Sequence, residues 1–220
     1  MSLGQKIMRN GKNYIALIIL FLFPLTVFTC DYLLYSSDYY IEESLKKIEE
    51  EWAAKGEDVS DTIDMTKSVL RNPGFVLSFS FYHSMSILRN LFFLNLLIYV
   101  TLLLIVEGHL NVKEFLKLVS MPVLILIFGW GINAILKLAL LQLNVFTNLQ
   151  MIVETQTGTA IHALVRNIEL FSIGYLIWLS LNVSKNYNEK FLTIAFVVFG
   201  NFLILTFSSV LIGFDFVLVS

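Results

Sequence analysis

Residues 191–212, FLTIAFVVFGNFLILTFSSVLI, contain no charged side chain and are apolar along almost their whole length. A hydrocarbon core about 30 Å thick is crossed by roughly 20 residues of α-helix, because each helical residue rises about 1.5 Å. This stretch therefore predicts a helix that crosses a membrane. Four more apolar runs of similar character begin near Tyr14, Leu91, Val119 and Ile168. We expect an all-α integral membrane protein, a bundle of five transmembrane helices.

The composition of the chain agrees with a membrane location. Hydrophobic residues make up 57% of the 220 residues and charged residues only 15%, whereas soluble domains contain about 45–50% apolar and about 25% charged residues. The single cysteine, Cys30, excludes an internal disulfide and a cluster of thiolates on a metal. A chain of this length fits one membrane domain with one extramembrane element.

Acidic residues gather in one segment, which divides the chain into three parts. Between Asp38 and Arg71 stand ten acidic and five basic residues, a net charge of −5, while the whole chain carries −2. We therefore expect residues 1–35 to form a basic tail and the first membrane anchor. Residues 36–74 are expected to form an acidic extramembrane hairpin, and residues 75–220 a membrane region of four helices.

The basic residues of the short joints predict the orientation of the chain, because lysine and arginine resist transfer across a membrane. They lie before the first run, between the second and third runs, and between the fourth and fifth runs. The joint of residues 145–159 has none. The residues concerned are Lys6, Arg9, Lys12, Lys113, Lys117, Lys185 and Lys190. With the N-terminus in the cytoplasm all of them fall on the cytoplasmic side, and the hairpin and C-terminus are expected outside.

The first run also resembles a secretory signal, since a basic tail precedes an apolar stretch that ends in Cys30. One interpretation is a lipoprotein signal with a lipid on Cys30. The other is an uncleaved signal anchor, which is favoured because Val27, Phe28 and Thr29 differ from the small residues that a signal peptidase requires.

Residues 36–74 predict two amphipathic helices. The first helix has apolar residues at helical spacing with Glu and Lys between them. These apolar residues are Ile41, Leu45, Ile48 and Trp52. After Gly56, a weaker stripe of apolar residues predicts the second helix. Asp58 or Ser60 is its expected N-cap, and Asn72-Pro73-Gly74 ends it.

The hairpin either covers its own apolar faces or docks a partner outside the membrane. Tyr39, Tyr40 and Trp52 are the candidate residues of that partner surface, because aromatic side chains serve as anchors near a membrane interface. The run Glu49-Glu50-Glu51 lacks the spaced loop of a calcium site. No metal or cofactor is expected.

The segment from Phe75 to Leu88 mixes phenylalanines with serines, His83 and a following arginine, Arg89. We expect an in-plane helix at the outer interface that turns into the crossing at Leu91, and not a sixth crossing. A sixth crossing would move every later joint to the other side and invert the distribution of lysines.

Polar residues in the third and fourth crossings form the candidate functional site. Asn133 and Lys137 lie four residues apart on one helix face. His162, Arg166 and Glu169 follow with the same kind of spacing. One interpretation has these residues converge at the outer ends of their helices, where they bind a lipid headgroup, an anion or a partner. In the other, Lys137 extends to the headgroups, and Arg166 and Glu169 pair with each other.

Two stretches carry a family resemblance. Residues 106–122, VEGHLNVKEFLKLVSMP, contain a glycine, a short polar joint, an amphipathic restart and a proline. Residues 167–172, NIELFS, lead into IWLSL at residues 177–181. These stretches resemble the Yip1-domain family of integral membrane proteins, especially its short prokaryotic members, and the likeness extends over about residues 84–212.

The resemblance implies five crossings, a cytoplasmic N-terminus and an outside C-terminus. Eukaryotic members of the family are trafficking factors that bind small GTPases. The long cytoplasmic N-terminal region and the Asp-Leu-Tyr-Gly-Pro element of those members are absent from this chain, which puts small-GTPase binding in doubt. What the resemblance implies is a scaffold or accessory role in a prokaryotic cytoplasmic (inner) membrane.

The sequence contains none of the common catalytic signatures. It has no His-Glu-x-x-His, no Gly-x-Ser-x-Gly and no phosphate loop, and no basic patch for a nucleic acid. We therefore expect a non-enzymatic scaffold or accessory subunit that binds other membrane subunits or serves membrane organisation and trafficking. The alternative is a transporter of a small solute, an ion or a lipid, which would use the polar residues of the third and fourth crossings.

Overall fold

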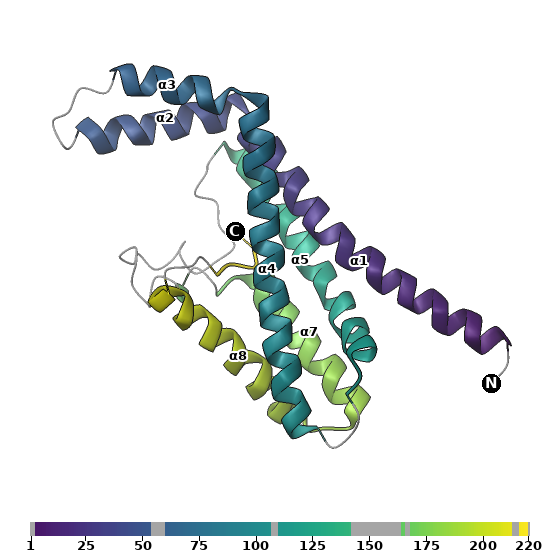
Figure 1. The fold of residues 1–220 in the computed structure, drawn as a ribbon. Coiled ribbons are helices and arrows are strands. Elements are labelled where there is room, and N and C mark those ends of the chain that lie inside the picture. The colour runs from purple at the N-terminus through teal and green to yellow at the C-terminus, as the bar shows by residue number, and fades with distance from the viewer. Residues whose placement is uncertain are drawn as a thin grey trace.

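Helices account for every regular element in the part of the chain that the structure describes. The structure is a computed structural model that describes residues 3–53, 60–106, 110–141, 164–165, 168–212 and 216–219, with side chains from residue 14 on except 47, 51–53, 60 and 61. The helices are α1 (Leu3–Tyr35), α2 (Asp38–Ala53), α3 (Ser60–Leu70), α4 (Pro73–Ile105), α5 (Val112–Leu140), α7 (Leu170–Tyr187) and α8 (Phe191–Ile212) (Figure 1). The all-α prediction is confirmed for these residues.

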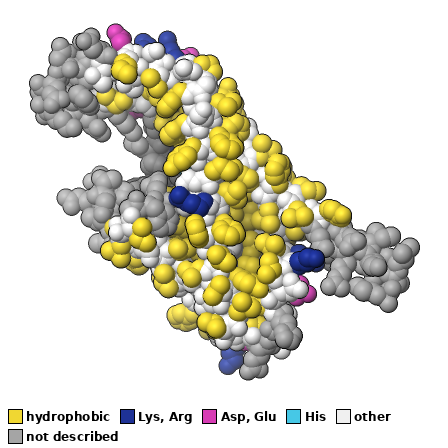
Figure 2. Space-filling view, in the orientation of Figure 1, with side chains coloured by type: hydrophobic (Ala, Val, Ile, Leu, Met, Phe, Trp, Pro, Cys, Tyr) yellow, Lys and Arg dark blue, Asp and Glu magenta, His cyan; other side chains and the backbone are white. Residues whose placement is uncertain are grey.

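Four helices in the described residues are long and apolar enough to cross a membrane. They are Tyr14–Tyr35 of α1, Pro73–Ile105 of α4, Val112–Leu140 of α5 and Phe191–Ile212 of α8. Their outward faces carry large apolar side chains such as Phe21, Leu104 and Leu211, which are 71%, 83% and 87% exposed. Apolar side chains cover most of the face that Figure 2 shows. Such surfaces suit lipid, because contact with water would cost about 25 cal/mol per Å², and they are compatible with an integral membrane protein.

The fourth predicted crossing corresponds to α7, which does not belong to this set. It has 18 residues, and its last two turns contain Asn182, Lys185 and Asn186. These polar side chains lower the apolar character of a helix that is already short.

The long helices pack around one apolar core. α1 lies against α4 and α5, α7 lies against α5, and α8 lies against α7 and α4. Hydrogen bonds also cross this core. The hydroxyl of Tyr175 in α7 is fully buried and donates to Oδ1 of Asn95 in α4 at 2.7 Å. Thr101 of α4 donates to Oδ1 of Asn201 in α8 at 3.3 Å. Buried polar groups need such partners, because an unmade hydrogen bond in an apolar environment is costly.

A glycine permits close contact between α5 and α7. A Cβ atom added at Gly129 would lie 2.7 Å from Cγ of Phe171, so only glycine leaves room for this ring. One turn away, Gly174 of α7 packs against Ile125 of α5. Small residues at a helix interface let two helices approach closely, as in many membrane proteins.

The segment from Phe75 to Leu88 is the first half of α4 and not a separate in-plane helix. α4 runs without interruption from Pro73 to Ile105 and is drawn as one helix in Figure 1. The predicted turn before Leu91 is therefore wrong. The physical reason is that proline and glycine stand only at the start of α4, where Asn72 caps the helix and accepts a hydrogen bond from the backbone N–H of Gly74 at 2.9 Å.

The two short helices α2 and α3 pack on each other and extend sideways from the end of α1 and the start of α4 (Figure 1). Tyr35 of α1 joins them to the rest of the molecule. Its ring contacts Tyr40 of α2 and Phe79 of α4 edge-on, with centroids 4.7 and 5.0 Å apart. The ion pair of Asp38 with Arg71, at 3.8 Å, is exposed and contributes little to stability.

Candidate functional site

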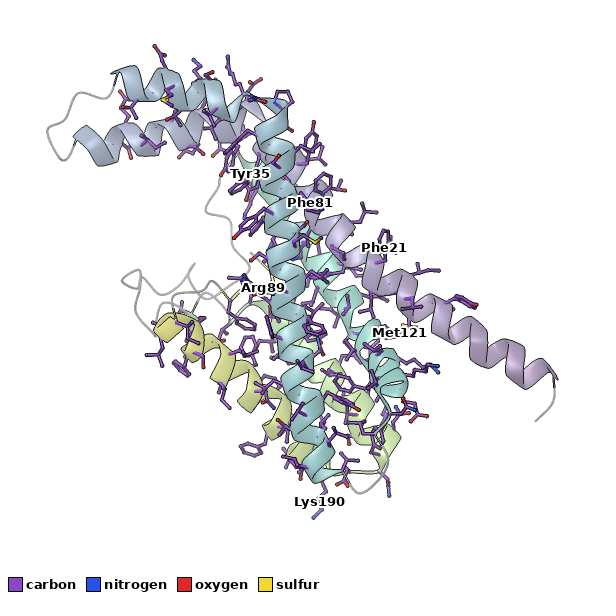
Figure 3. The ribbon with its side chains drawn as sticks, viewed as in Figure 1. Phe21, Tyr35, Phe81, Arg89, Met121 and Lys190 are labelled. Atoms are coloured by element: carbon purple, nitrogen blue, oxygen red, sulfur yellow. The ribbon has the colours of Figure 1, made fainter. Side chains whose placement is uncertain are left out.

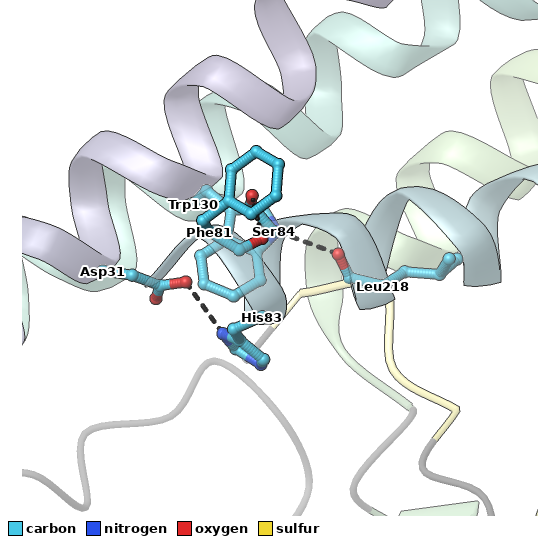
Figure 4. A network of polar contacts seen from close by, with 6 residues as sticks. All are labelled: Asp31, Phe81, His83, Ser84, Trp130 and Leu218. Atoms are coloured by element: carbon cyan, nitrogen blue, oxygen red, sulfur yellow. Dashed lines mark hydrogen bonds and ion pairs between the residues drawn. The ribbon is translucent and has the colours of Figure 1, made fainter. Parts of the chain in front are cut away.

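A buried carboxylate meets a half-buried imidazole between α1 and α4. Asp31 of α1 is only 3% exposed, and its Oδ2 lies 2.8 Å from Nδ1 of His83 in α4 (Figure 4). Each side chain is held by a helix that satisfies its own backbone, so both point inward from rigid elements. A carboxylate away from water is costly without a partner. His83 supplies that partner.

Two further elements complete this network. The ring of His83 contacts Trp130 of α5 edge-on at a centroid distance of 5.9 Å. The indole Nε1 of Trp130 donates to the backbone carbonyl of Leu218 at 2.9 Å, as Figure 4 shows. The network thus joins α1, α4, α5 and the segment 216–219 near the C-terminus.

The segment 216–219 packs into the bundle. Phe216, Val217, Leu218 and Val219 are each at most 2% exposed. Besides the bond from Trp130, the carbonyl of Val217 accepts a hydrogen bond from Nδ2 of Asn90 at 3.1 Å. Residues 216–219 are not helical, so their carbonyls need hydrogen-bond donors from outside the segment. Side chains of α4 and α5 donate the hydrogen bonds to the carbonyls of Val217 and Leu218.

Lys137 lies beside this network. It is 9% exposed near the end of α5, and its charge acts on Asp31. Lys137, Asp31 and Trp130 line a cavity of about 30 Å³, room for about one water molecule. We name Asp31, His83, Trp130 and Lys137 the buried polar cluster. It combines one carboxyl group, one imidazole, one indole and one amine.

The structure places three of the five predicted site residues inside the bundle. Asn133, Lys137 and Glu169 are 1%, 9% and 1% exposed. Glu169 precedes α7, and its Oε2 accepts a hydrogen bond from the backbone N–H of Ser172 at 2.7 Å, so it caps that helix. His162 and Arg166 lie outside the described residues. The convergence of all five residues therefore stays a prediction.

The predicted partner surface is also only partly described. Tyr40 is half-buried against Tyr35, and its burial raises the pKa of the phenol, so Tyr40 stays neutral well above physiological pH. Tyr39 is half-buried in the same turn of α2. Trp52 belongs to α2, but its side chain lies outside the described residues.

Sequence reasoning missed Asp31, His83 and Trp130 as members of one site. The available signal was Asp31 itself, the one charged residue within the span Tyr14–Tyr35. An isolated acid in an apolar run indicates a buried partner. Among the residues that the structure describes, no three His, Cys, Asp or Glu side chains are grouped so that they could hold a metal ion.

Comparisons of the chain with protein-family models, with curated proteins and with solved structures gave no match. The resemblance to the Yip1-domain family therefore stays a prediction. Function has to be inferred from the helices and from the groups that they bring together.

Proposed function

We propose that the protein is a non-enzymatic membrane scaffold or accessory subunit that binds a partner protein through the α2–α3 hairpin outside the membrane. Its five crossings are α1, α4, α5, α7 and α8. In α7, 18 residues rise about 27 Å, which nearly matches a core of about 30 Å. The N-terminus is cytoplasmic and the C-terminus is outside, in a prokaryotic inner membrane.

Lysines at one end of the bundle support this orientation. Tyr14 of α1 lines the same groove as Lys113 and Lys117 of α5, so both spans begin at one end of the bundle. Lys185 stands in the last turn of α7. Lys190 stands just before α8, at the lower end of the bundle in Figure 3. An end that carries several lysines in short joints is expected to face the cytoplasm.

The length of α4 is the observation that carries the proposal. Its 33 residues rise about 50 Å, roughly 20 Å more than a hydrocarbon core requires. The C-terminal end of α4 lies at the end of the bundle that carries the lysines. If this end is at the inner boundary of the membrane, the first turns of α4 extend beyond the outer boundary. α4 then acts as an arm that presents the hairpin away from the lipid.

The exposed side chains of the hairpin fit a partner that is partly apolar and basic. On α3, Met65 and Val69 lie four residues apart and are 72% and 38% exposed. On α2, Glu42, Glu49 and Glu50 are exposed. A hairpin that exposes both apolar and acidic side chains suits such a partner.

Site-specific photo-cross-linking in cells tests this proposal. A photoreactive residue in place of Met65 is expected to give a discrete adduct with another protein. The control position is Leu211 of α8, which is 87% exposed on an apolar helix and should give no such adduct. The absence of a protein adduct from Met65 would overturn the proposal.

Charge variants test whether the adduct forms by specific docking. Glu42→Gln, Glu49→Gln and Glu50→Gln together remove three exposed acids from α2 and should weaken the adduct. Lys46→Gln with Lys67→Gln is the matched control, since both lysines are exposed on the same hairpin, and it should leave the adduct intact or strengthen it. Equal adducts from both variants would argue against docking through the acids.

The buried polar cluster favours a second candidate function, transport of protons or of a small solute. Ionisable groups in a bundle of membrane helices often belong to a transport pathway, and in this orientation Asp31, His83 and Lys137 lie together at the outer ends of α1, α4 and α5. A proteoliposome flux that is lost in Asp31→Asn and in His83→Gln would favour this function. If the purified chain moves no solute, transport is rejected and the scaffold proposal stands.

A further inference from the structure

A groove between α1 and α5 lies at the end of the bundle that carries the lysines. Its volume is about 420 Å³, within the range of about 300–1,000 Å³ that is usual for small-molecule sites. Tyr14, Leu17 and Leu20 of α1 line it together with Lys113, Leu116 and Lys117 of α5. Figure 3 shows α1 and α5 side by side next to this groove, where it labels Phe21 of α1, which follows Leu20, and Met121 of α5, one turn after Lys117.

The position of the groove matches a membrane boundary. The apolar run of α1 begins at Tyr14, two residues after Lys12, and the uncharged apolar run of α5 begins after Lys117. A tyrosine and two lysines at the start of a span lie at the level of the lipid headgroups. Leu17 and Leu20, one and two turns further along α1, lie at the level of the acyl chains.

The charges of the groove suit an anion. Lys113 is exposed and Lys117 is half-buried, and the two lie one turn apart on the same face of α5. The positive end of the α5 dipole is at the same place. The first-turn amides already have acceptors, since the N–H groups of Lys113, Glu114 and Phe115 bond to Asn111. Contacts with an anion must therefore come from the two lysine side chains.

Glu114, the acid next to Lys113 in the sequence, also acts on another helix. The charge of Glu114 acts on Tyr187, at the end of α7, whereas the groove lies between α5 and α1. Three further bases, Lys6, Arg9 and Lys12, precede Tyr14 in the sequence. Among the described residues, the lining of the groove thus combines two lysines with apolar side chains.

We propose that this groove binds an anionic phospholipid, with the phosphate on Lys113 and Lys117 and an acyl chain along Leu17 and Leu20. The two lysines account for selection of the headgroup, and the apolar walls account for retention of the chain. The other described cavities differ from this groove, because none of their linings contains a pair of lysines. The inference requires only that α1 and α5 cross a membrane and does not depend on the function of the hairpin.

Native mass spectrometry of the full chain in mild detergent tests this site. Phosphatidylglycerol is titrated against phosphatidylcholine, and the fraction of protein with one bound lipid is measured. We expect a preference for phosphatidylglycerol that falls about fivefold for each lysine removed, because one lysine near an anionic lipid contributes roughly this factor. Equal binding of the two lipids would overturn the proposal.

The matched control uses lysines from the same end of the bundle. Lys113→Gln with Lys117→Gln should abolish the preference, while Lys185→Gln with Lys190→Gln changes the net charge equally and should retain it. All four lysines are exposed or half-buried, so both variants are expected to fold. An equal loss in both variants would indicate a general charge effect and would overturn the site.

A third variant tests the acyl chain. Leu17 is 60% exposed, so Leu17→Trp can fill the groove from its open side without entering the core. It should weaken phosphatidylglycerol binding, and free glycerol phosphate, which has the headgroup chemistry without a chain, should not compete. Full lipid binding in Leu17→Trp, or effective competition by glycerol phosphate, would show that the lysines bind a phosphate alone and would overturn the lipid assignment.

Discussion

Asp31 illustrates how a single charged residue is accommodated in an apolar helix. The carboxylate is 3% exposed and has a close partner, His83, at 2.8 Å. Lys137 adds a positive charge nearby. Breaking such a pair costs more than the pair itself contributes, because the remaining group loses its partner while it stays wholly or largely out of water; Asp31 is buried and His83 half-buried.

We expect Asp31→Ala to lower the free energy of unfolding by about 1–3 kcal/mol, since it leaves the His83 ring without its acceptor. The double variant Asp31→Leu with His83→Phe should lose less free energy of unfolding than the single variants Asp31→Leu and His83→Phe lose together, because neither member of the pair then remains without its partner. Thermal unfolding in detergent measures both effects. Strictly additive losses would show that the two residues do not interact.

At the scale of elements, the helices were predictable and their lengths were not. Apolar runs predicted α1, α4, α5 and α8 because lipid-facing helices need few polar residues. The continuity of α4 was missed, since its serines and His83 interrupt the apolar pattern. Ser84 shows why they do not break the helix: its hydroxyl donates to the carbonyl of Phe81 at 2.8 Å within the same helix.

The packing of α5 on α7 gives a prediction with an internal control. Gly129→Ala should lower the free energy of unfolding by about 1–3 kcal/mol, because the new Cβ would collide with Phe171 at 2.7 Å. Gly131→Ala adds the same atom in the same helix where nothing lies within 4 Å, and it should be neutral or stabilise by up to about 1 kcal/mol. The melting temperatures of the two variants, measured under the same conditions, decide the point. Equal effects would contradict this packing.

The segment 216–219 gives a second prediction at this scale. Trp130→Phe removes the donor to the carbonyl of Leu218 and should make the backbone of this segment exchange hydrogen faster. Trp178→Phe is the control, since Trp178 is 37% exposed on α7. Hydrogen exchange with mass spectrometry reads the segment directly. Unchanged protection in Trp130→Phe would show that this hydrogen bond does not hold the segment.

At the scale of the whole molecule, the sequence indicated which residues are polar but not which of them meet. Asn133, Lys137 and Glu169 were predicted because each interrupts an apolar run. Asp31 and His83 are 52 positions apart, and no local pattern links positions on two different helices. Tertiary packing alone brings them together, so the buried polar cluster became visible only in the structure.

The molecule has two distinct ends in our account: one with lysines at the starts of α5 and α8, and one with the acidic hairpin on the arm of α4. The central claim is that these ends lie on opposite sides of a membrane. The claim can be tested without any knowledge of the partner, because the chain has a single natural cysteine, Cys30.

The most direct test labels single cysteines in intact cells with a maleimide that does not cross membranes. In a Cys30→Ser background, Asp64→Cys on α3 and Lys190→Cys before α8 are compared, since both positions are exposed. We predict that Asp64→Cys is labelled from outside and that Lys190→Cys is labelled only after the membrane is permeabilised. Labelling of both positions from the same side, or in the reverse order, would contradict the account.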